Sequence, residues 1–370
     1  MLCRKALKGR ALAAISGFWY GMCTLLVMST TSKSPKKVAE AAYYIARNVL
    51  PQYGSRYSPR KFTQPQLFAC LVLKVFFKTD YRGIVHILDD WPSICQIIEL
   101  KQIPHFTTLQ KASKRLLRSS TVEQLLEGTV AVVGQGKRIE RCAVDSTGLQ
   151  AGHISRYFVR RKRSKQLETT EETHYRRWPK LGLACDCSNH LILSAITGRG
   201  PGVDVNQFER ILAPAVERRC IDYVLADAGY DSESNHRFAR ERHHILSIIP
   251  PNHGRPTLNS KPFKGTYREL MRTEFDKEVY GQRWQVETVI SMIKRNQGDE
   301  LRARCYWSQN REMLLKVLTH NIAVILLLLY ELFYRADRTP LIPSFNSFNS
   351  PQSGLSPPYI YHKIHNLIER

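Results

Sequence analysis

Apolar positions in the first third of the chain recur at helical spacing. Residues 65–77 place their apolar side chains three and four positions apart, as on the buried face of a helix. A second helix is expected at 36–50, which Pro51 ends, and a third at 107–117, capped by Thr107 or Thr108. We therefore predict a helical domain over residues 33–130.

From about residue 138 the pattern changes to short β-rich runs separated by turns. The order is three strands, helix, strand, helix, strand, helix, which predicts an α/β fold with a mixed sheet flanked by helices. Strands are expected at 142–145, 181–187, 191–197, 223–227 and 245–249, and helices at 206–218, 232–242, 280–296 and 312–334. This second domain is predicted to span residues 138–335.

The ends of the chain have a different texture. Residues 1–32 form an apolar extension in which basic residues precede the uncharged stretch 11–28, and three interpretations stay open. In the first, the true start is Met28 and the extension is dispensable. In the second the extension is a buried helix, and in the third it is a targeting segment. Residues 336–370 contain five prolines and are predicted to form a flexible tail.

A second apolar run, residues 322–329, lies between His320 and Glu331. It is too short for a comfortable membrane span and is better interpreted as part of a buried core helix. No stable membrane association is therefore expected.

Composition limits the function classes. The 55 lysines and arginines exceed the 32 acidic residues and give a net charge of +23, which points to a polyanionic partner, either nucleic acid or an anionic membrane surface. Nine scattered cysteines do not form the framework of a small secreted disulfide scaffold. Cys185 and Cys187 are interpreted as strand residues, and a reducing intracellular compartment is favoured. The cations on the outer face of the 107–117 helix then suggest backbone contact with nucleic acid, with a solvated face as the alternative.

Two apolar strands run into an aspartate. Asp145 follows Ala143-Val144 and Asp227 follows Leu225-Ala226. Burying a carboxylate is costly unless it is paired or holds a cation, and two such groups at one mouth of a sheet repel each other until a divalent metal neutralises them. The alternative is that each aspartate caps the next turn.

The helix expected at 280–296 supplies a third carboxylate. At about 100° per residue, Tyr280, Arg283, Glu287 and Lys294 share an arc roughly 60° wide. A neighbouring apolar arc suits docking on a sheet, and it consists of Val286, Val289, Ile290 and Ile293. An i,i+4 salt-bridge ladder is the alternative interpretation, and Lys294 fits it poorly.

Asp145, Asp227 and Glu287 together offer hard oxygen ligands suited to Mg²⁺ or Mn²⁺. Two such ions about 4 Å apart can activate a water or a 3′-hydroxyl and stabilise the leaving oxygen of a phosphodiester. Arg283 and Lys294 would then bind flanking phosphates, and Tyr280 would contact a phosphate or a base.

Other acidic and nucleophilic residues carry weaker signals. Asp231 is interpreted as a helix cap, with a role as metal ligand or supporting group as the alternative, and Asp204 as the cap of the helix after Gly202. Ser146 and Thr147 are assigned to a turn, because no base has recognisable spacing to them.

A basic run without acids follows the first aspartate strand. Its cations are Arg156, Arg160, Arg161, Lys162, Arg163 and Lys165, with Tyr157, Phe158, Tyr175 and Trp178 nearby. Beside a phosphodiester-cleaving site, phosphate contact is favoured over a solvated loop. The aromatic residues suit base stacking or packing equally.

The spacing Tyr280-x2-Arg283-x3-Glu287-x6-Lys294 resembles the Y-R-E-K signature of bacterial insertion-sequence transposases with a D-D-E triad. Asp145 in V-D-S-T and Asp227 in D-x-G-Y-D-S are similar to that family's first and second aspartates. The resemblance covers residues 138–335, with a weaker likeness over 60–118.

The resemblance implies a ribonuclease H-like catalytic fold and Mg²⁺-dependent DNA cleavage and strand transfer, with Mn²⁺ able to substitute. It also implies terminal inverted repeats and target DNA as partners, a homo-oligomer in the active complex, and a cytoplasmic location at the bacterial nucleoid. Some relatives carry a large β-rich insertion before the glutamate helix, whereas residues 250–279 leave room only for a short one. The resemblance therefore does not extend to a hairpin-forming cleavage step that depends on that insertion.

Two other functions stay open. The chain could be a degenerate or domesticated copy that binds DNA without cutting it, although its carboxylate set is intact. It could also be a membrane-anchored protein that uses residues 11–28 and 322–329.

Overall fold

The computed structural model describes residues 31–133, 138–151, 159–163, 170–174, 177–252 and 265–336. At 159–163, 170–174 and 330–336 it describes the backbone alone. The expectations for the N-terminal extension and the C-terminal tail fall outside these residues, apart from Thr31, Ser32 and Ala336. The same holds for Arg156, Tyr157, Phe158, Lys165 and Tyr175.

The N-terminal region is helical, as expected. Its helices are α2 (Pro35–Val49), α3 (Gln64–Phe76), α4 (Tyr81–Asp90), α5 (Pro92–Ile97), α6 (Phe106–Leu116) and α7 (Ser119–Val132). Side chains begin several of them: Thr63 and Gln66 form a capping box on α3, and Asp80 accepts two backbone N–H bonds at the start of α4. The expected cap of α6 was wrong, because His105 rather than Thr107 or Thr108 precedes the helix and accepts from the Thr107 N–H.

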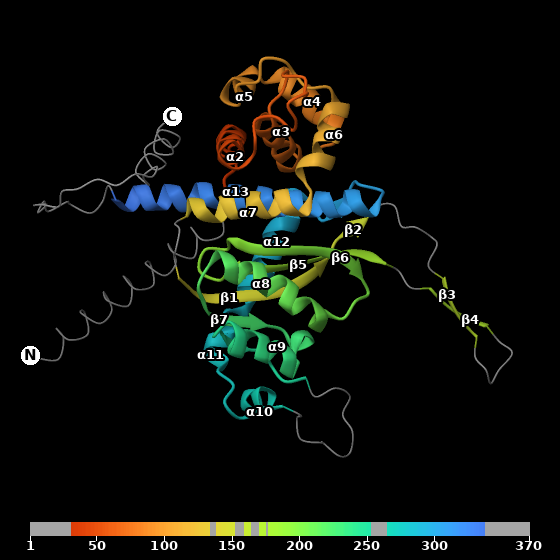
Figure 1. Cartoon of the computed structure of the whole chain (residues 1–370), viewed down its shortest axis with the longest axis vertical. Helices are drawn as coiled ribbons and strands as arrows, with labels where there is room; N and C mark the ends of the chain where they lie inside the picture. Colours follow the sequence, from red (N-terminus) through yellow and green to blue (C-terminus); the bar gives the residue numbers. More distant parts are fainter. Residues whose placement is uncertain are drawn as a thin grey trace, which may run out of the picture.

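A five-stranded mixed sheet forms the second part of the fold, in the order β6-β5-β1-β7-β8 (Figure 1). The strands are β1 (Ile139–Gly148), β5 (Trp178–Asp186), β6 (Ile192–Gly200), β7 (Ile221–Ala226) and β8 (Leu246–Ile248). The first three form an antiparallel meander, and β7 and β8 run parallel to β1. The expected α/β class, a mixed sheet with helices that follows a helical region, is confirmed.

Helices cover the sheet. In Figure 1, α8 (Phe208–Arg218) lies in front of the sheet and α12 (Trp284–Gln297) passes behind it. α8 contacts β5 and β6, and α12 contacts β1. Cys185 is a buried residue of β5, as expected, whereas the expectation for Cys187 was wrong, because it is buried in the turn just after that strand.

The last helix, α13 (Tyr306–Ala336), joins the two parts of the fold. It packs against α2, α3 and α7 on one side and against β5 and β6 on the other. Among the described residues, only its span Tyr306–Leu329 is long and apolar enough to cross a membrane, with a mean hydropathy of 1.8. Of the most apolar 18-residue stretch of this span, 78% is buried inside the protein. This is the burial expected of a core helix. The predicted domain limits stay a prediction, since one apolar core runs through both parts.

Three elements differ from the expectations. β1 continues to Gly148, past Asp145, because β5 pairs with it through Gly148↔Lys180. The helix expected at 280–296 is divided into α11 (Lys277–Tyr280), the 3₁₀ turn η4 (Gly281–Arg283) and α12, with the break at Gly281. The helix expected at 232–242 is α9 (Glu233–Arg237) followed by the π-helical turn η3 (Phe238–Arg242).

Short elements complete the described chain. They are β2 (Gln150–Ala151), β3 (Val159–Arg163), β4 (Thr170–His174), η1 (Asp204–Gln207), η2 (Ala228–Tyr230), α10 (Thr266–Thr273) and β9 (Glu300–Leu301). The sequence pattern did not predict α10, which lies in the polar stretch 250–279.

Asn321 on α13 is expected to be essential for stability. Its buried amide bonds both the N–H and the C=O of Ile192 in β6, at 2.9 and 2.8 Å, and donates to Thr129 of α7. Asn321→Leu should lower the free energy of unfolding by about 3 kcal/mol, because buried backbone groups lose their partners. Equilibrium urea denaturation measures this. Asn310→Leu on the same helix is the control, because the buried Asn310 amide oxygen has no hydrogen-bond partner in the described part of the chain. Equal stability of the two variants would contradict the prediction.

Candidate active site

Asp145 and Asp227 lie side by side at one edge of the sheet. Pairing between β1 and β7 ends at Val144↔Ala226, so each aspartate is the next residue of its strand. The Asp145 side chain is 21% exposed, while Asp227 is open to solvent. Two carboxylates distant in sequence are thus brought together by parallel strand pairing.

Both aspartates also accept a hydrogen bond from the backbone N–H of the next residue. Asp145 Oδ1 accepts from the Ser146 N–H at 2.7 Å, and Asp227 Oδ1 accepts from the Ala228 N–H at 2.8 Å. Asp227 is the residue that caps η2. The turn-capping alternative therefore holds for one oxygen of Asp227. It does not hold for Asp145, because both Asp145 and Ser146 lie within β1.

Arg283 connects the first aspartate with Glu287. The η4 turn contacts both β1 and β7 and places the Arg283 guanidinium 3.6 Å from Asp145 Oδ2. The same guanidinium forms an ion pair with Glu287, whose side chain is 56% exposed. The i,i+4 pair proposed as the alternative interpretation of this helix is therefore present, and its arginine also contacts Asp145.

The chemistry of these carboxylates fits a hard divalent cation, but their present arrangement does not form a complete ligand set. Among the described residues, no three His, Cys, Asp or Glu side chains are grouped closely enough to hold a metal ion. The Asp145 pKa is nevertheless raised to about 6, mainly by burial, and Asp227 and Glu287 add to the rise while Ser146 and Arg283 oppose it. Asp227 and Glu287 are thus each close enough to Asp145 to disfavour its negative charge, a cost that a cation would relieve.

Tyr280 lies beside this group and Lys294 does not. Burial raises the Tyr280 pKa, and the Asp227 and Asp145 carboxylates raise it further against the opposing charge of Arg283. Lys294 is half-buried two turns along α12 and has no ion pair among the described side chains. Of the four residues in the Y-R-E-K spacing, Tyr280, Arg283 and Glu287 therefore lie near the aspartates. Lys294 lies farther along α12.

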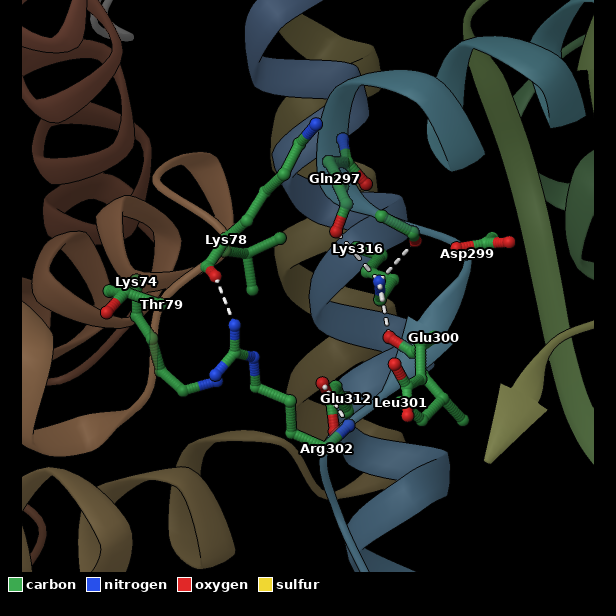
Figure 2. Close-up of a pocket in the computed structure, with 12 residues that line it drawn as sticks. Lys74, Lys78, Thr79, Gln297, Asp299, Glu300, Leu301, Arg302, Glu312 and Lys316 are labelled. Carbon is green, nitrogen blue, oxygen red and sulfur yellow. Dashed lines mark hydrogen bonds between the residues drawn. The ribbon is translucent and has the colours of Figure 1, made fainter. Parts of the chain in front are cut away.

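The far end of α12 is fixed by a buried lysine. Lys316 of α13 donates to the carbonyls of Gln297 and Gly298 at 2.8 and 2.5 Å, and to that of Glu300 at 3.3 Å (Figure 2). It lines a cavity of about 550 Å³ between α3, α12 and α13, and burial lowers its pKa to about 8. These bonds satisfy the carbonyl of the last α12 residue and two carbonyls of the segment that follows it, and they hold this end of α12 in place.

A polar group behind Asp145 was missed by the sequence analysis. Asp204 accepts from Ser146 Oγ at 2.7 Å and forms an ion pair with the buried Lys180 at 2.5 Å. The expectation that Asp204 caps a helix was wrong, since it forms no side-chain capping bond. Lys180 within the apolar strand 178–186 was the available signal, because a lysine there needs an acidic partner. Tyr230 is buried close by, and its pKa is raised by burial and by the Asp204 charge.

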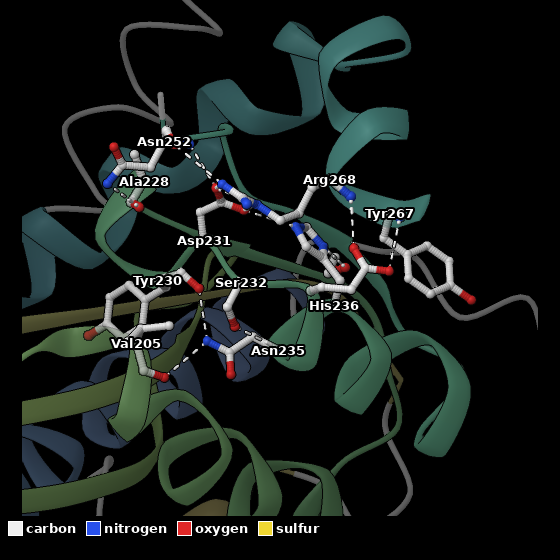
Figure 3. Close-up of polar contacts among 12 residues, drawn as sticks. Val205, Ala228, Tyr230, Asp231, Ser232, Asn235, His236, Asn252, Tyr267 and Arg268 are labelled. Atoms are coloured by element: carbon white, nitrogen blue, oxygen red, sulfur yellow. Dashed lines mark hydrogen bonds and ion pairs between the residues drawn. The ribbon is translucent and has the colours of Figure 1, made fainter. Parts of the chain in front are cut away.

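The interpretation of Asp231 as a helix cap was also wrong. Ser232 caps α9, and the Asp231 side chain has no solvent exposure and pairs with Arg268 of α10 at 2.6 Å (Figure 3).

The basic run forms a separate two-stranded sheet with β4. Arg160 faces Thr173, Arg161 faces Glu172, Lys162 faces Glu171 and Arg163 faces Thr170 in the register. The backbone therefore brings two acids opposite two of the cations. The side chains of this ribbon lie outside the described part of the structure, and their role stays a prediction.

Comparisons with known proteins identify the family of this chain. The family described as "Transposase DDE domain" matches residues 136–322, and the chain belongs to this transposase family. The resemblance based on the Y-R-E-K spacing is confirmed.

Two individual proteins are also similar. An uncharacterized protein of Aquifex aeolicus (strain VF5) is 23% identical over 284 residues, which cover 75% of this chain and 82% of that protein. A cryo-EM structure of the piggyBac transposase synaptic complex with hairpin DNA is similar with a TM-score of 0.39 and 9% identity, over 92% of this chain and 84% of that one.

Removal of the Asp145 charge should stabilise the metal-free protein. The folded pKa of about 6 exceeds the ordinary 3.8, so ionisation costs stability above pH 6, and the cost disappears as the pH falls toward 4. In EDTA, Asp145→Asn should raise the free energy of unfolding at pH 8 by up to about 3 kcal/mol and should have no such effect near pH 4. Denaturant unfolding at both pH values measures this, with the exposed Asp299→Asn as control. A destabilised variant at pH 8 would show that the Arg283 pair outweighs the cost of burial.

Proposed function

We propose that this chain is a metal-dependent transposase that binds the ends of an insertion element, cuts DNA there and transfers the strand. The observation that carries the proposal is the adjacency of Asp145 and Asp227 at the sheet edge, with Glu287 joined to Asp145 through Arg283. Membership of the DDE transposase family supports it.

In this proposal Asp145, Asp227 and Glu287 hold Mg²⁺, and Mn²⁺ is expected to substitute. Bound divalent ions would activate a water or a 3′-hydroxyl and stabilise the leaving oxygen. Glu287 becomes available when its ion pair with Arg283 opens. A DNA phosphate is a suitable competitor for that guanidinium, because arginine binds phosphate in a bidentate manner.

The remaining signature residues are assigned to the DNA strand. Arg283 would turn from the acids to a phosphate next to the cleaved bond, and Lys294 extends the cationic row along α12. Tyr280, beside the aspartates, would bind a phosphate or stack on a base. Terminal repeats, target DNA and further copies of the chain are the proposed partners, and a cytoplasmic location follows from them.

Cleavage is expected to depend on the three acids. A supercoiled plasmid that carries the genomic sequences flanking the coding region is the substrate, incubated with and without Mg²⁺. Asp227→Asn and Glu287→Gln should each slow strand cleavage at least about 100-fold, because a metal ion supplies several kcal/mol of charge stabilisation.

Binding is measured separately on the same DNA by gel shift. Both variants should bind it as the unaltered chain does, and Asp299→Asn, at the far end of α12, should cut normally. Binding by the unaltered chain without cleavage in either Mg²⁺ or Mn²⁺ would favour the degenerate copy that only binds DNA.

The β3 cations give a second test. Replacement of Arg160, Arg161, Lys162 and Arg163 by glutamine removes four side chains that are proposed to neutralise DNA phosphates. The slope of log K against log salt should become shallower by as much as about 0.9 for each phosphate that the variant no longer neutralises. Titration of fluorescent duplex DNA at several salt concentrations measures the slope. An unchanged slope would place this ribbon away from the DNA.

A further inference from the structure

A buried polar network lies directly behind the turn that carries Asp227. The side chain of Asp231 has no solvent exposure, and Arg268 binds both of its oxygens, with distances of 3.1 and 3.0 Å from Nε and 2.6 Å from Nη2 (Figure 3). The Asn252 N–H donates to the same carboxylate at 2.7 Å. His236 Nε2 lies 3.7 Å from Oδ1 of Asp231. The Asp231 pKa is lowered to about 2, because the contacts of its carboxylate with His236, Arg268 and Asn252 outweigh its burial.

This network is coupled to Asp227 through one short turn. The Tyr230 N–H bonds the Asp227 carbonyl at 2.9 Å, and the Asp231 N–H bonds the Ala228 carbonyl at 3.2 Å. A shift of the Asp231 backbone therefore moves the turn that begins at Asp227. Asn235 holds the same turn from α9 by donating to the Tyr230 carbonyl at 2.8 Å.

Arg268 comes from α10, the helix that the sequence pattern did not predict. Glu233 of α9 accepts the Tyr267 and Arg268 N–H groups at 3.3 and 3.2 Å, so α10 begins on α9. Gly265 precedes it with a φ of 126°, and a side chain there would meet Glu233. α10 is thus docked in one orientation, with Arg268 directed at Asp231.

A buried ion pair is a poor source of stability, since desolvation of the two charges offsets their attraction. What it provides is a fixed geometry, because the planar guanidinium fork accepts a carboxylate in few orientations. Asp231 lies four residues after Asp227, so a fixed geometry of the ion pair also restricts the position of Asp227.

We propose that Asp231 and Arg268 are positioning residues for Asp227. Their ion pair clamps the η2 turn from the side opposite the sheet and so fixes the Asp227 carboxylate where it can bind a metal ion together with Asp145. This inference rests on the proposed function, and it assigns a task to α10.

The test measures metal affinity, with Mn²⁺ as the probe and its electron paramagnetic resonance signal as the readout. The unaltered full-length protein is expected to bind Mn²⁺ at a site that Asp227→Asn removes. Arg268→Lys, which keeps the charge but loses the fork, should weaken that binding about 10-fold, and Arg268→Gln should weaken it more, as is usual for groups that orient metal ligands. Arg272→Gln is the matched control: it lies on the same helix, is 53% exposed and pairs with the exposed Glu269, so Mn²⁺ affinity should not change.

Thermal unfolding by circular dichroism separates positioning from folding. A merely structural role for the pair would lower the fraction of folded protein and leave the Mn²⁺ dissociation constant of the folded fraction unchanged, which would overturn the proposal. If Arg268→Gln does not fold, Arg268→Lys decides by the same criterion. If the unaltered protein has no Mn²⁺ site that Asp227→Asn removes, the proposed function fails first, and this outcome is distinct from failure of the clamp alone.

Discussion

Parallel pairing between β1 and β7 is the constraint on which the rest of the site depends. It ends at Val144 and Ala226, and because it ends there the next residue of each strand is an aspartate at the same edge. A register shifted by one residue would send one of these side chains to the other face of the sheet. Every other feature of the site is arranged around this pair: η4 rests on both strands, and the β5 hairpin extends β1 beyond it.

The site concentrates charge where the solvent is partly excluded. Burial and neighbouring acids work against ionisation of Asp145, and Arg283 offsets part of that cost through its contacts with Asp145 and Glu287. Behind Asp145, the buried Lys180 forms an ion pair with Asp204. A fold selected for stability alone would place apolar side chains here, so this edge carries a structural cost that chemistry at the site would explain.

Sequence patterns were sufficient for features that depend on local spacing. The β5–β6 hairpin, the strands before the two aspartates and the Y-R-E-K spacing over α11, η4 and α12 all follow from periodicity and motif spacing over short stretches of sequence. The Asp231–Arg268 and Lys180–Asp204 pairs could not be found in this way, because each joins residues far apart in sequence and only the tertiary fold brings them together. The division of the 280–296 helix was missed for a related reason: its first turn tightens where η4 meets β1 and β7.

The position of α13 has a consequence for how such a protein can be rearranged. One helix supplies core side chains both to the N-terminal helices and to the sheet, and Asn321 bonds α7 and β6 from the same point. Neither half can pivot against the other without opening that shared interior. If the N-terminal helices bind a DNA duplex, α13 therefore sets the angle at which that duplex approaches the aspartates. Grafting the helices of a relative would therefore require exchanging the matching surface of α13 as well.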